Sequence, residues 1–324
     1  MFAPSRFRAA APSAAFALIL FVAPCLARAE GEAIHLARRG KAGDLYKYQV
    51  TTHSKGELDI SSSQDPILQD VTRTKIILQK RLGADPKSGN VRIETRLLSG
   101  KKMDAQTEKT TTEILTPFDV SFIVAPDRMY SGGKALPLPV TKGKPKPLST
   151  AAANAALLDA TEFFMDAPLP ARLLRVGDTW TGVNPKNPYN TALADDKDVP
   201  FTATLAAIET HRGVPCAKVT YVITYKGDVA SFRAKVMKEA PEDAEMVGES
   251  EINGTATAYF SLDRGEIMDR DITIKTKHKY KVGIGVPIEG KEYLKEIEVE
   301  GEGATETHIT ALTFPPYDAS LRGK

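Results

Sequence analysis

Polar and apolar residues alternate along much of the chain with the period of two residues that is typical of β-strands. The clearest stretch is 271–282, where apolar and aromatic residues lie on one face and lysines lie on the other. The first face carries Ile272, Ile274, Thr276, His278, Tyr280 and Val282, and the second carries Lys275, Lys277, Lys279 and Lys281. This pattern predicts a strand with one face in a core and one face in water.

Several other stretches are rich in Thr, Val, Ile and Tyr, which favour strands. Short segments with Gly, Asp or Pro, such as 83–89, 211–213 and 263–265, separate them and are typical of hairpin turns. Strands joined by such turns run antiparallel. The predicted strands are Leu45–His53, Val71–Leu82, Asn90–Ser99, Phe201–Thr210, Ala217–Tyr225, Glu249–Leu262, Glu266–Val282 and Tyr293–Leu312.

The stretch after the lysine strand carries the opposite charge. Beyond a predicted loop at 283–290, one face holds Leu294 and the glutamates at 296, 298, 300 and 302, and the other holds Tyr293, Ile297 and Val299. The predicted pairs are Lys279 with Glu296, Lys277 with Glu298 and Lys275 with Glu300. Exposed pairs of this kind contribute little free energy, but they specify the register that keeps both apolar faces together.

The middle of the chain has a different composition. Residues 136–148 are rich in Pro and Lys and predict an extended linker. A helix is predicted near 149–165, because Ser149 or Thr150 can cap it, alanines favour it, and Pro168 and Pro170 end it. Its apolar stripe holds Ala153, Leu157, Ala160 and Phe164.

These elements predict a mainly β fold, in which hairpins form one or more long, curved antiparallel sheets. Strands of this length must twist and coil, which leaves a concave face. Gly43–Tyr46 and Gly177–Trp180 are similar sequences at the starts of two β-regions, which suggests a two-fold repeat. A half-barrel is the other architecture that the sequence leaves undecided. The predicted organisation is a signal peptide at 1–29, a β-region at 30–135, the linker at 136–148, and the helix with a second β-region at 149–324.

The first residues have the features of an export signal. An apolar run follows Arg6 and Arg8, and Ala27-Arg28-Ala29 is a small-x-small site that predicts a mature chain beginning at Glu30. The alternative is a lipoprotein anchored through Cys25, which Pro24 at the preceding position disfavours. The expected location is periplasmic or secreted, without an integral membrane segment after cleavage.

Loss of residues 1–29 removes three arginines and no acidic residue from a chain with 43 basic and 41 acidic residues, so the mature chain is almost neutral. Nucleic acid is therefore not an expected partner. Only Cys216 remains after cleavage, and its strand-like context predicts a buried, inert thiol without a disulfide.

The sequence contains no local motif of the common hydrolase, nucleotide-binding or zinc-binding classes. Its five histidines have no ligand spacing, and His278 is interpreted as a satisfied core residue. The acidic stretch 239–245 matches no calcium-loop pattern and is interpreted as a solvated loop. We therefore expect no cofactor, no metal and no enzymatic activity.

A resemblance rests on the Gly-Asp-aromatic strand openings, on Leu169–Trp180 and on Tyr259-Phe-Ser-Leu-Asp-Arg-Gly265. With these motifs the chain resembles uncharacterised exported bacterial β-rich proteins, a group with a domain of unknown function. In architecture it is remotely similar to periplasmic lipoprotein carriers and related lipid-binding proteins. The resemblance implies a curved sheet around an apolar cavity and transfers no functional residue.

Three functional hypotheses follow from these features. The first is a non-catalytic envelope protein whose concave face binds an apolar ligand, a lipid or an envelope protein. The second is a structural or assembly protein with a filled core, and the third is an enzyme whose site is assembled only in space. Candidate ligand-binding residues for the first hypothesis are Ile252, Phe260, Ile272, Ile274, Tyr280, Ile297 and Val299.

Overall fold

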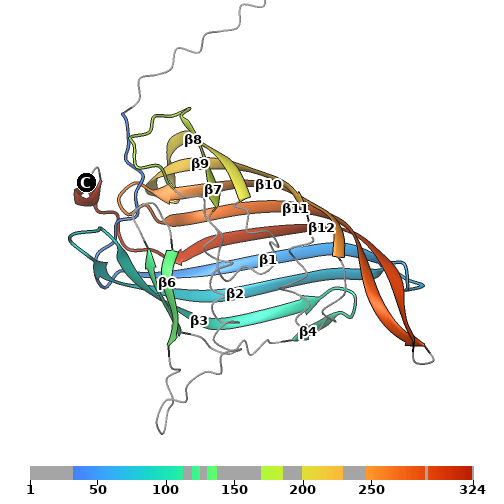
Figure 1. The fold of residues 1–324 in the computed structure, drawn as a ribbon. Helices are drawn as coiled ribbons and strands as arrows, with labels where there is room; N and C mark the ends of the chain where they lie inside the picture. The colour runs from blue at the N-terminus through green and yellow to red at the C-terminus, as the bar shows by residue number, and fades with distance from the viewer. Residues whose placement is uncertain are drawn as a thin grey trace, which may run out of the picture. The chain divides into compact units, whose positions relative to one another are not determined.

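The computed structural model describes residues 32–111, 119–124, 130–136, 169–184, 199–228, 246–288 and 291–322. In these residues the chain forms one 12-stranded antiparallel sheet, with strand order β6-β5-β3-β2-β1-β12-β11-β10-β9-β8-β7 and with β4 paired to β3 (Figure 1). The strands are β1 (Leu45–Ile60), β2 (Ile67–Ala84), β3 (Val91–Asp104), β4 (Lys109–Thr111), β5 (Asp119–Val124), β6 (Tyr130–Leu136), β7 (Thr179–Asn184), β8 (Val199–His211), β9 (Val214–Asp228), β10 (Met246–Ser261), β11 (Ile267–Ile288) and β12 (Lys291–Thr313).

The predicted mainly β class is confirmed, and each predicted strand is present, extended at one or both ends. The predicted linker, apart from its first residue, and the predicted helix lie outside the described residues. Within the described part of the chain the single helical element is a short 3-10 turn, Ala319–Leu321.

The two predicted β-regions belong to one open sheet. Pairing of β1 with β12 over most of their length joins them, while β6 and β7 form the two edges in the described chain. Sequence neighbours pair as successive hairpins on both sides of this junction. The first and last strands of the chain thus lie together in the middle of the sheet.

The predicted register of the lysine and glutamate strands is wrong by four residues. Lys279 lies opposite Glu300 rather than Glu296, and Lys277 lies opposite Glu302. The predicted loop at 283–290 caused the error, because β11 continues to Ile288 and β12 begins at Lys291. Since the shift is an even number of residues, every side chain keeps its predicted face.

Two similar turns open β1 and β7. Gly43 and Gly177 have φ angles of 91° and 87°, and each donates its N–H to a carbonyl of the next paired strand, at 2.9 and 2.7 Å. The following residues, Asp44 and Asp178, each accept a hydrogen bond from the backbone N–H three residues earlier, at 2.9 Å in both turns. The sequence echo between the two β-regions therefore corresponds to the same local structure.

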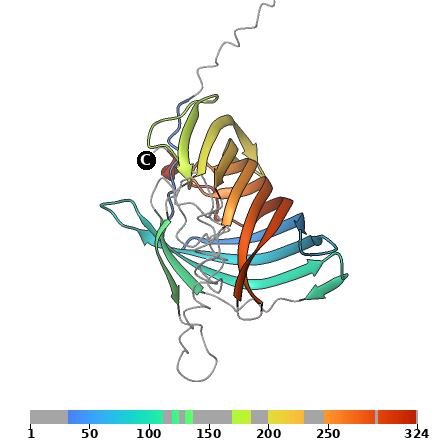
Figure 2. The ribbon, with the colours of Figure 1, turned by 45° about the vertical axis from the view of Figure 1, so that its right-hand side comes forward.

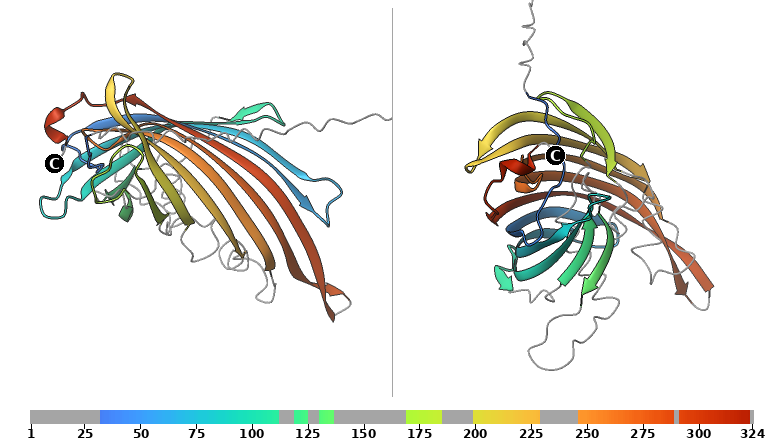
Figure 3. Two further views of the ribbon diagram at one scale, coloured as in Figure 1. Left: turned by 90° about the horizontal axis from the view of Figure 1, so that it is seen from above. Right: turned by 90° about the vertical axis from the view of Figure 1, so that its left-hand side faces the viewer.

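The sheet is twisted and bent along its strands, so that one face is concave (Figures 2 and 3). We call the concave face the inner face and the opposite one the outer face. Exposure alternates accordingly: residues 272, 274, 276, 278 and 280 of β11 are half-buried on the inner face, and 275, 277, 279 and 281 are exposed on the outer face.

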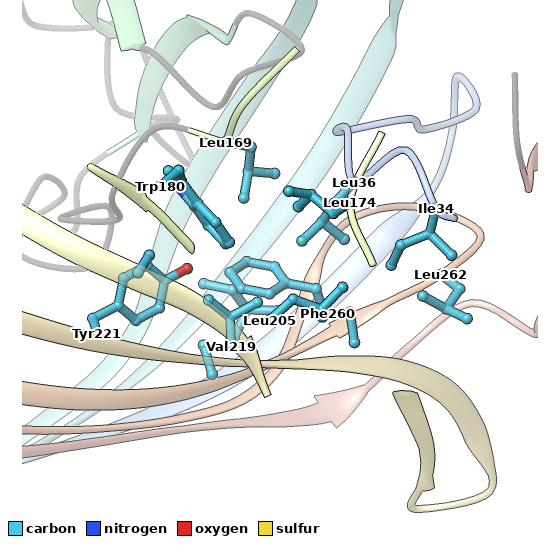
Figure 4. Close-up of a cluster of buried hydrophobic side chains, with 14 of the residues drawn as sticks. Ile34, Leu36, Leu169, Leu174, Trp180, Leu205, Val219, Tyr221, Phe260 and Leu262 are labelled. Atoms are coloured by element: carbon cyan, nitrogen blue, oxygen red, sulfur yellow. The ribbon is translucent and has the colours of Figure 1, made fainter. Parts of the chain in front are cut away.

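One end of the inner face carries the apolar core. There the segment before β1 and the segment before β7 meet through a pair of backbone hydrogen bonds between Ile34 and Leu174, each of 2.8 Å. They cover the inner face of β8, β9 and β10 (Figure 4). The core cluster includes Ile34, Leu36, Leu169, Leu174, Trp180, Leu205, Val219, Tyr221, Phe260 and Leu262.

Candidate functional site

Beyond the core cluster, the inner face of β1 and β9–β12 carries a band of apolar side chains, which we call the inner strip. Nearly all of its side chains are half-buried, whereas the outer-face residues of the same strands are largely exposed. The inner strip consists of Leu58, Ile60, Ile223, Tyr225, Ile252, Ile272, Ile274, Tyr280, Ile297 and Val299.

Strand register brings these residues together. Val299 lies opposite both Tyr280 of β11 and Ile60 of β1, and Ile252 lies opposite Tyr225 of β9. Because directly opposite side chains on one face are in contact distance, these pairs join β1, β12 and β11, and separately β10 and β9. Between β10 and β11 the two parts meet at Gly254, which lies opposite both Ile223 and Ile274.

Glycines make the inner strip flat. A Cβ atom at Gly301 would lie 2.8 Å from Cδ1 of Leu58, and one at Gly227 would collide with the ring of Tyr225. These two large side chains therefore lie across the space that the missing side chains leave. The result is a low apolar surface instead of a layer of upright, interdigitating side chains.

Most of the candidate residues from the sequence lie in the inner strip. They are Ile252, Ile272, Ile274, Tyr280, Ile297 and Val299. Phe260 lies on the same face but at the other end of β10, where it is 0% exposed within the core cluster. The structure thus separates Phe260 from the other candidates.

Polar groups within the strip are satisfied locally. Oγ of Ser250 and Nδ1 of His278 are 2.9 Å apart, and burial lowers the pKa of His278 below its usual 6.5. Burial also raises the pKa of Tyr280. The interpretation of His278 as a hydrogen-bonded histidine on the apolar face agrees with these contacts.

The outer face behind the strip has the opposite character. Lys277, Lys279 and Lys281 form ion pairs with glutamates of β12, the shortest being 2.6 Å between Lys281 and Glu298. A depression of about 390 Å³ lies here, lined mainly by six acidic residues and three lysines of β1 and β9–β12. Its charged lining does not suit an apolar ligand.

A buried ion cluster near the start of β11 was missed from the sequence. Glu266, 1% exposed, contacts the guanidinium groups of Arg38 and Arg81, at 2.8 Å for Arg38. Arg264 contacts Asp263 and lies 3.2 Å from Asp44. Burial lowers the pKa of Arg81 to about 10.

From the sequence, Asp263–Gly265 is predicted to be a hairpin turn and Glu266 the first residue of the next strand. In the structure the segment before β1 covers that turn so closely that a Cβ at Gly265 would collide with the carbonyl of Ala37. Charges that look solvated in the sequence are therefore buried by a segment more than 200 residues away.

A hydrogen-bonded chain on the outer face joins two histidines that are far apart in sequence. His211 Nε2 lies 2.5 Å from Asp269, whose other oxygen accepts from Thr310 Oγ1 at 2.7 Å. Thr310 Oγ1 lies 2.6 Å from His308 Nε2, and Nδ1 of His308 contacts Asp271. The chain links side chains of β8, β11 and β12. No local motif could have revealed it.

The remaining expectations concern the thiol, metals and the membrane. Cys216 is 0% exposed and free, and burial raises its pKa to about 12, which confirms that it is buried. In the part of the chain that the structure describes, no group of three or more His, Cys, Asp or Glu side chains could hold a metal ion. No helix among the described residues has the length and apolar character to span a bilayer.

No protein-family model and no curated protein matches this chain. Among solved structures, this chain is similar to lipovitellin, in a structure that describes lipid-protein interactions. The TM-score is 0.40 and the identity 8%, over 88% of this chain. This chain spans 27% of the length of that lipovitellin chain. A DUF1329 family protein from Desulfovibrio piger has a TM-score of 0.13 and 9% identity, over 85% of this chain and 89% of that protein.

The outer-membrane protein OccK5 of Pseudomonas aeruginosa has a TM-score of 0.24 and 7% identity, over 85% of this chain and 100% of that protein. At such low identities and TM-scores, these likenesses establish neither a family nor a ligand for this chain.

Proposed function

We propose that this protein is an exported, non-catalytic envelope protein that binds the acyl chain of a lipid on its inner strip. The observation that carries the proposal is the contrast between the two faces of one set of strands. The inner strip is apolar, flat and half-buried, whereas the outer face directly behind it is charged and ion-paired.

The dimensions of the strip fit an extended acyl chain. From Ile272 to Tyr280 along β11 the inner strip runs about 26 Å, at about 3.3 Å per residue. A flexible methylene chain can follow the flat surface above Gly301 and Gly303. Removal of its apolar area from water supplies the binding free energy, about 25 cal/mol for each Å² buried.

Two features support the non-catalytic and exported parts of the proposal. The polar groups near the strip are hydrogen-bonded to each other, as Ser250 is to His278, and the outer-face hydroxyl of Thr310 donates to Asp269. The segment 1–29 has the composition of a cleavable signal peptide.

Binding of a fluorescent fatty acid by the purified mature protein tests the proposal. Ile274→Asp places a carboxylate in the inner strip, and we expect at least about tenfold weaker binding, because an acyl chain cannot solvate that charge. Val222→Asp is the matched control, since Val222 is 52% exposed on the outer face of β9. We expect the control to bind like the wild type.

Circular dichroism must show that each variant is folded. If Ile274→Asp does not fold, Ile274→Thr keeps the β-branched shape, lowers the apolar area and should weaken binding to a smaller extent. The proposal fails if the wild type binds no fatty acid, or if the Ile274 and Val222 variants bind equally well. If the wild type binds no fatty acid, the structural or assembly role is favoured instead. The filled core cluster is the observation that supports that role.

A further inference from the structure

The inner face of β2 and β3 carries a group of cationic side chains. Arg73 of β2 lies directly opposite Lys102 of β3, and both are half-buried on the inner face. Lys75, two residues beyond Arg73 on the same face, is 6% exposed. Three cationic side chains therefore lie together on a largely buried surface.

Arg73 and Lys102 have no ion-pair partner in the described chain. Nε of Arg73 is buried and makes no hydrogen bond. The nearest carboxylate on this face is Asp104, opposite Val71, and it accepts hydrogen bonds from the backbone of Gln106 and Thr107 at 3.0 and 3.3 Å. By contrast, Lys277, Lys279 and Lys281 on the outer face of β11 are paired with glutamates.

Like charges directly opposite each other in a sheet are unfavourable, and a buried guanidinium without a hydrogen-bond acceptor is costly. An anion between Arg73 and Lys102 would remove both penalties. Phosphate oxygens suit this position, because a guanidinium binds them with two parallel hydrogen bonds.

The cationic pair lies beside the inner strip. Arg73 is opposite Thr52 of β1, Thr52 is opposite Thr307 of β12, and Thr307 is opposite Ile272. The pair is thus three strands from the strip, or about 14 Å at about 4.8 Å per strand. A lipid lying across the inner face can place its headgroup at the cationic pair and its acyl chain on the inner strip.

We propose that Arg73 and Lys102 bind the phosphate of an anionic phospholipid whose acyl chains occupy the inner strip. This inference rests on the proposed function and specifies its ligand class. It commits to a lipid headgroup rather than to free phosphate, because the cationic pair and the apolar inner strip lie on the same face, about 14 Å apart.

Calorimetric titration of the mature protein with three probes tests the inference. The probes are dioctanoyl phosphatidylglycerol, dioctanoyl phosphatidylcholine and inorganic phosphate. We expect the anionic lipid to bind about tenfold more tightly than the zwitterionic lipid, because both carry the same phosphate but Arg73 and Lys102 repel the choline cation of the zwitterionic lipid. We expect no measurable binding of inorganic phosphate alone.

Three inner-face variants and one outer-face control complete the experiment. Arg73→Gln and Lys102→Gln should abolish the preference for the anionic lipid, and Arg73→Lys should retain part of it. Lys277→Gln, on the outer face, should leave the preference unchanged. Because the like-charge contact is removed, Arg73→Gln should also raise the melting temperature of the lipid-free protein, which distinguishes a binding role from a structural one.

Equal binding of both lipids, or an unchanged preference in Arg73→Gln, overturns the headgroup site and leaves the acyl-chain proposal standing. Binding of neither lipid overturns both proposals. Tight binding of inorganic phosphate by itself would assign the pair to a free anion and contradict the lipid assignment. A lower melting temperature of Arg73→Gln would show that Arg73 stabilises the fold.

Discussion

At the scale of single residues, the charges of this protein divide into two kinds. Those on the outer face are exposed and paired across strands, such as Lys277 with Glu302. Those around Glu266 are buried, and one carboxylate there serves the two guanidinium groups of Arg38 and Arg81. The free energy of each kind depends on its solvation, so the same substitution has different consequences at the two places.

Glu266→Gln should destabilise the protein by about 3 kcal/mol or more, because two buried guanidinium groups lose their carboxylate. Glu302→Gln is the matched control, since Glu302 is 74% exposed and its loss should cost less than about 1 kcal/mol. Urea denaturation of both variants measures the difference. Similar midpoints for the two variants would contradict the burial of the Glu266 cluster.

His278 should make stability depend on pH. Its pKa in the folded protein is lowered by burial, so between that value and 6.5 the unfolded chain binds more protons than the folded one. Stability should therefore be full above pH 6.5 and fall as the pH decreases below it. The difference in melting temperature between wild type and His278→Gln, followed from pH 8 to pH 5, isolates this contribution. A pH-independent difference for His278→Gln would contradict the assignment.

The sequence predicted single residues well where the local pattern decides their environment. His278 and Cys216 were correctly placed because they lie within strands whose faces follow from alternation. Glu266 and His308 were missed, because their environments depend on segments from distant parts of the chain. Tertiary contacts of this kind leave no periodic signal in a single sequence.

At the scale of elements, the hairpin of β11 and β12 carries half of the inner strip. Its faces were predictable, since period-two alternation continues through both strands. Its register was not, because Gly283, Gly285 and Pro287 suggested a long loop where the strand continues. The alternation of polar and apolar residues decides the faces of a hairpin. The exact end of each strand decides its register.

Substitutions on the two faces of β11 should have very different effects on stability. Ile274→Asp places a carboxylate on the half-buried face and should cost more than about 2 kcal/mol. Lys277→Asp loses one exposed ion pair and should cost less than about 1 kcal/mol. Thermal melts of the two variants give the comparison, and equal small shifts would mean that the face assignment of β11 is wrong.

At the scale of the whole molecule, the described chain builds one open sheet from two β-regions. Pairing of β1 with β12 places the first and last strands side by side, and the backbone N–H of Asp318, after β12, donates to Asp263 in the turn before β11 at 2.8 Å. The mainly β class and the strands were predictable from alternation. The single sheet was not, because pairing between the first and last strands has no local signature.

Export is the molecular-scale prediction that the sequence supports most directly. We expect cleavage between Ala29 and Glu30, because Ala27 and Ala29 form a small-x-small site after an apolar run. Intact-mass measurement of protein purified from an envelope fraction gives the mature N-terminus. A chain that begins at Cys25 with attached acyl groups would show a lipoprotein instead.

The central claim, that an acyl chain lies on the inner strip, is tested most directly by photo-crosslinking. A phospholipid with a photoreactive group in its acyl chain is bound to the mature protein, and the complex is irradiated. Mass spectrometry then identifies the modified residues. The account predicts labels on inner-face residues such as Ile252, Ile274 and Val299, and none on the outer-face residues Lys277 and Glu300. Labels distributed equally over both faces, or confined to the outer face, would contradict it.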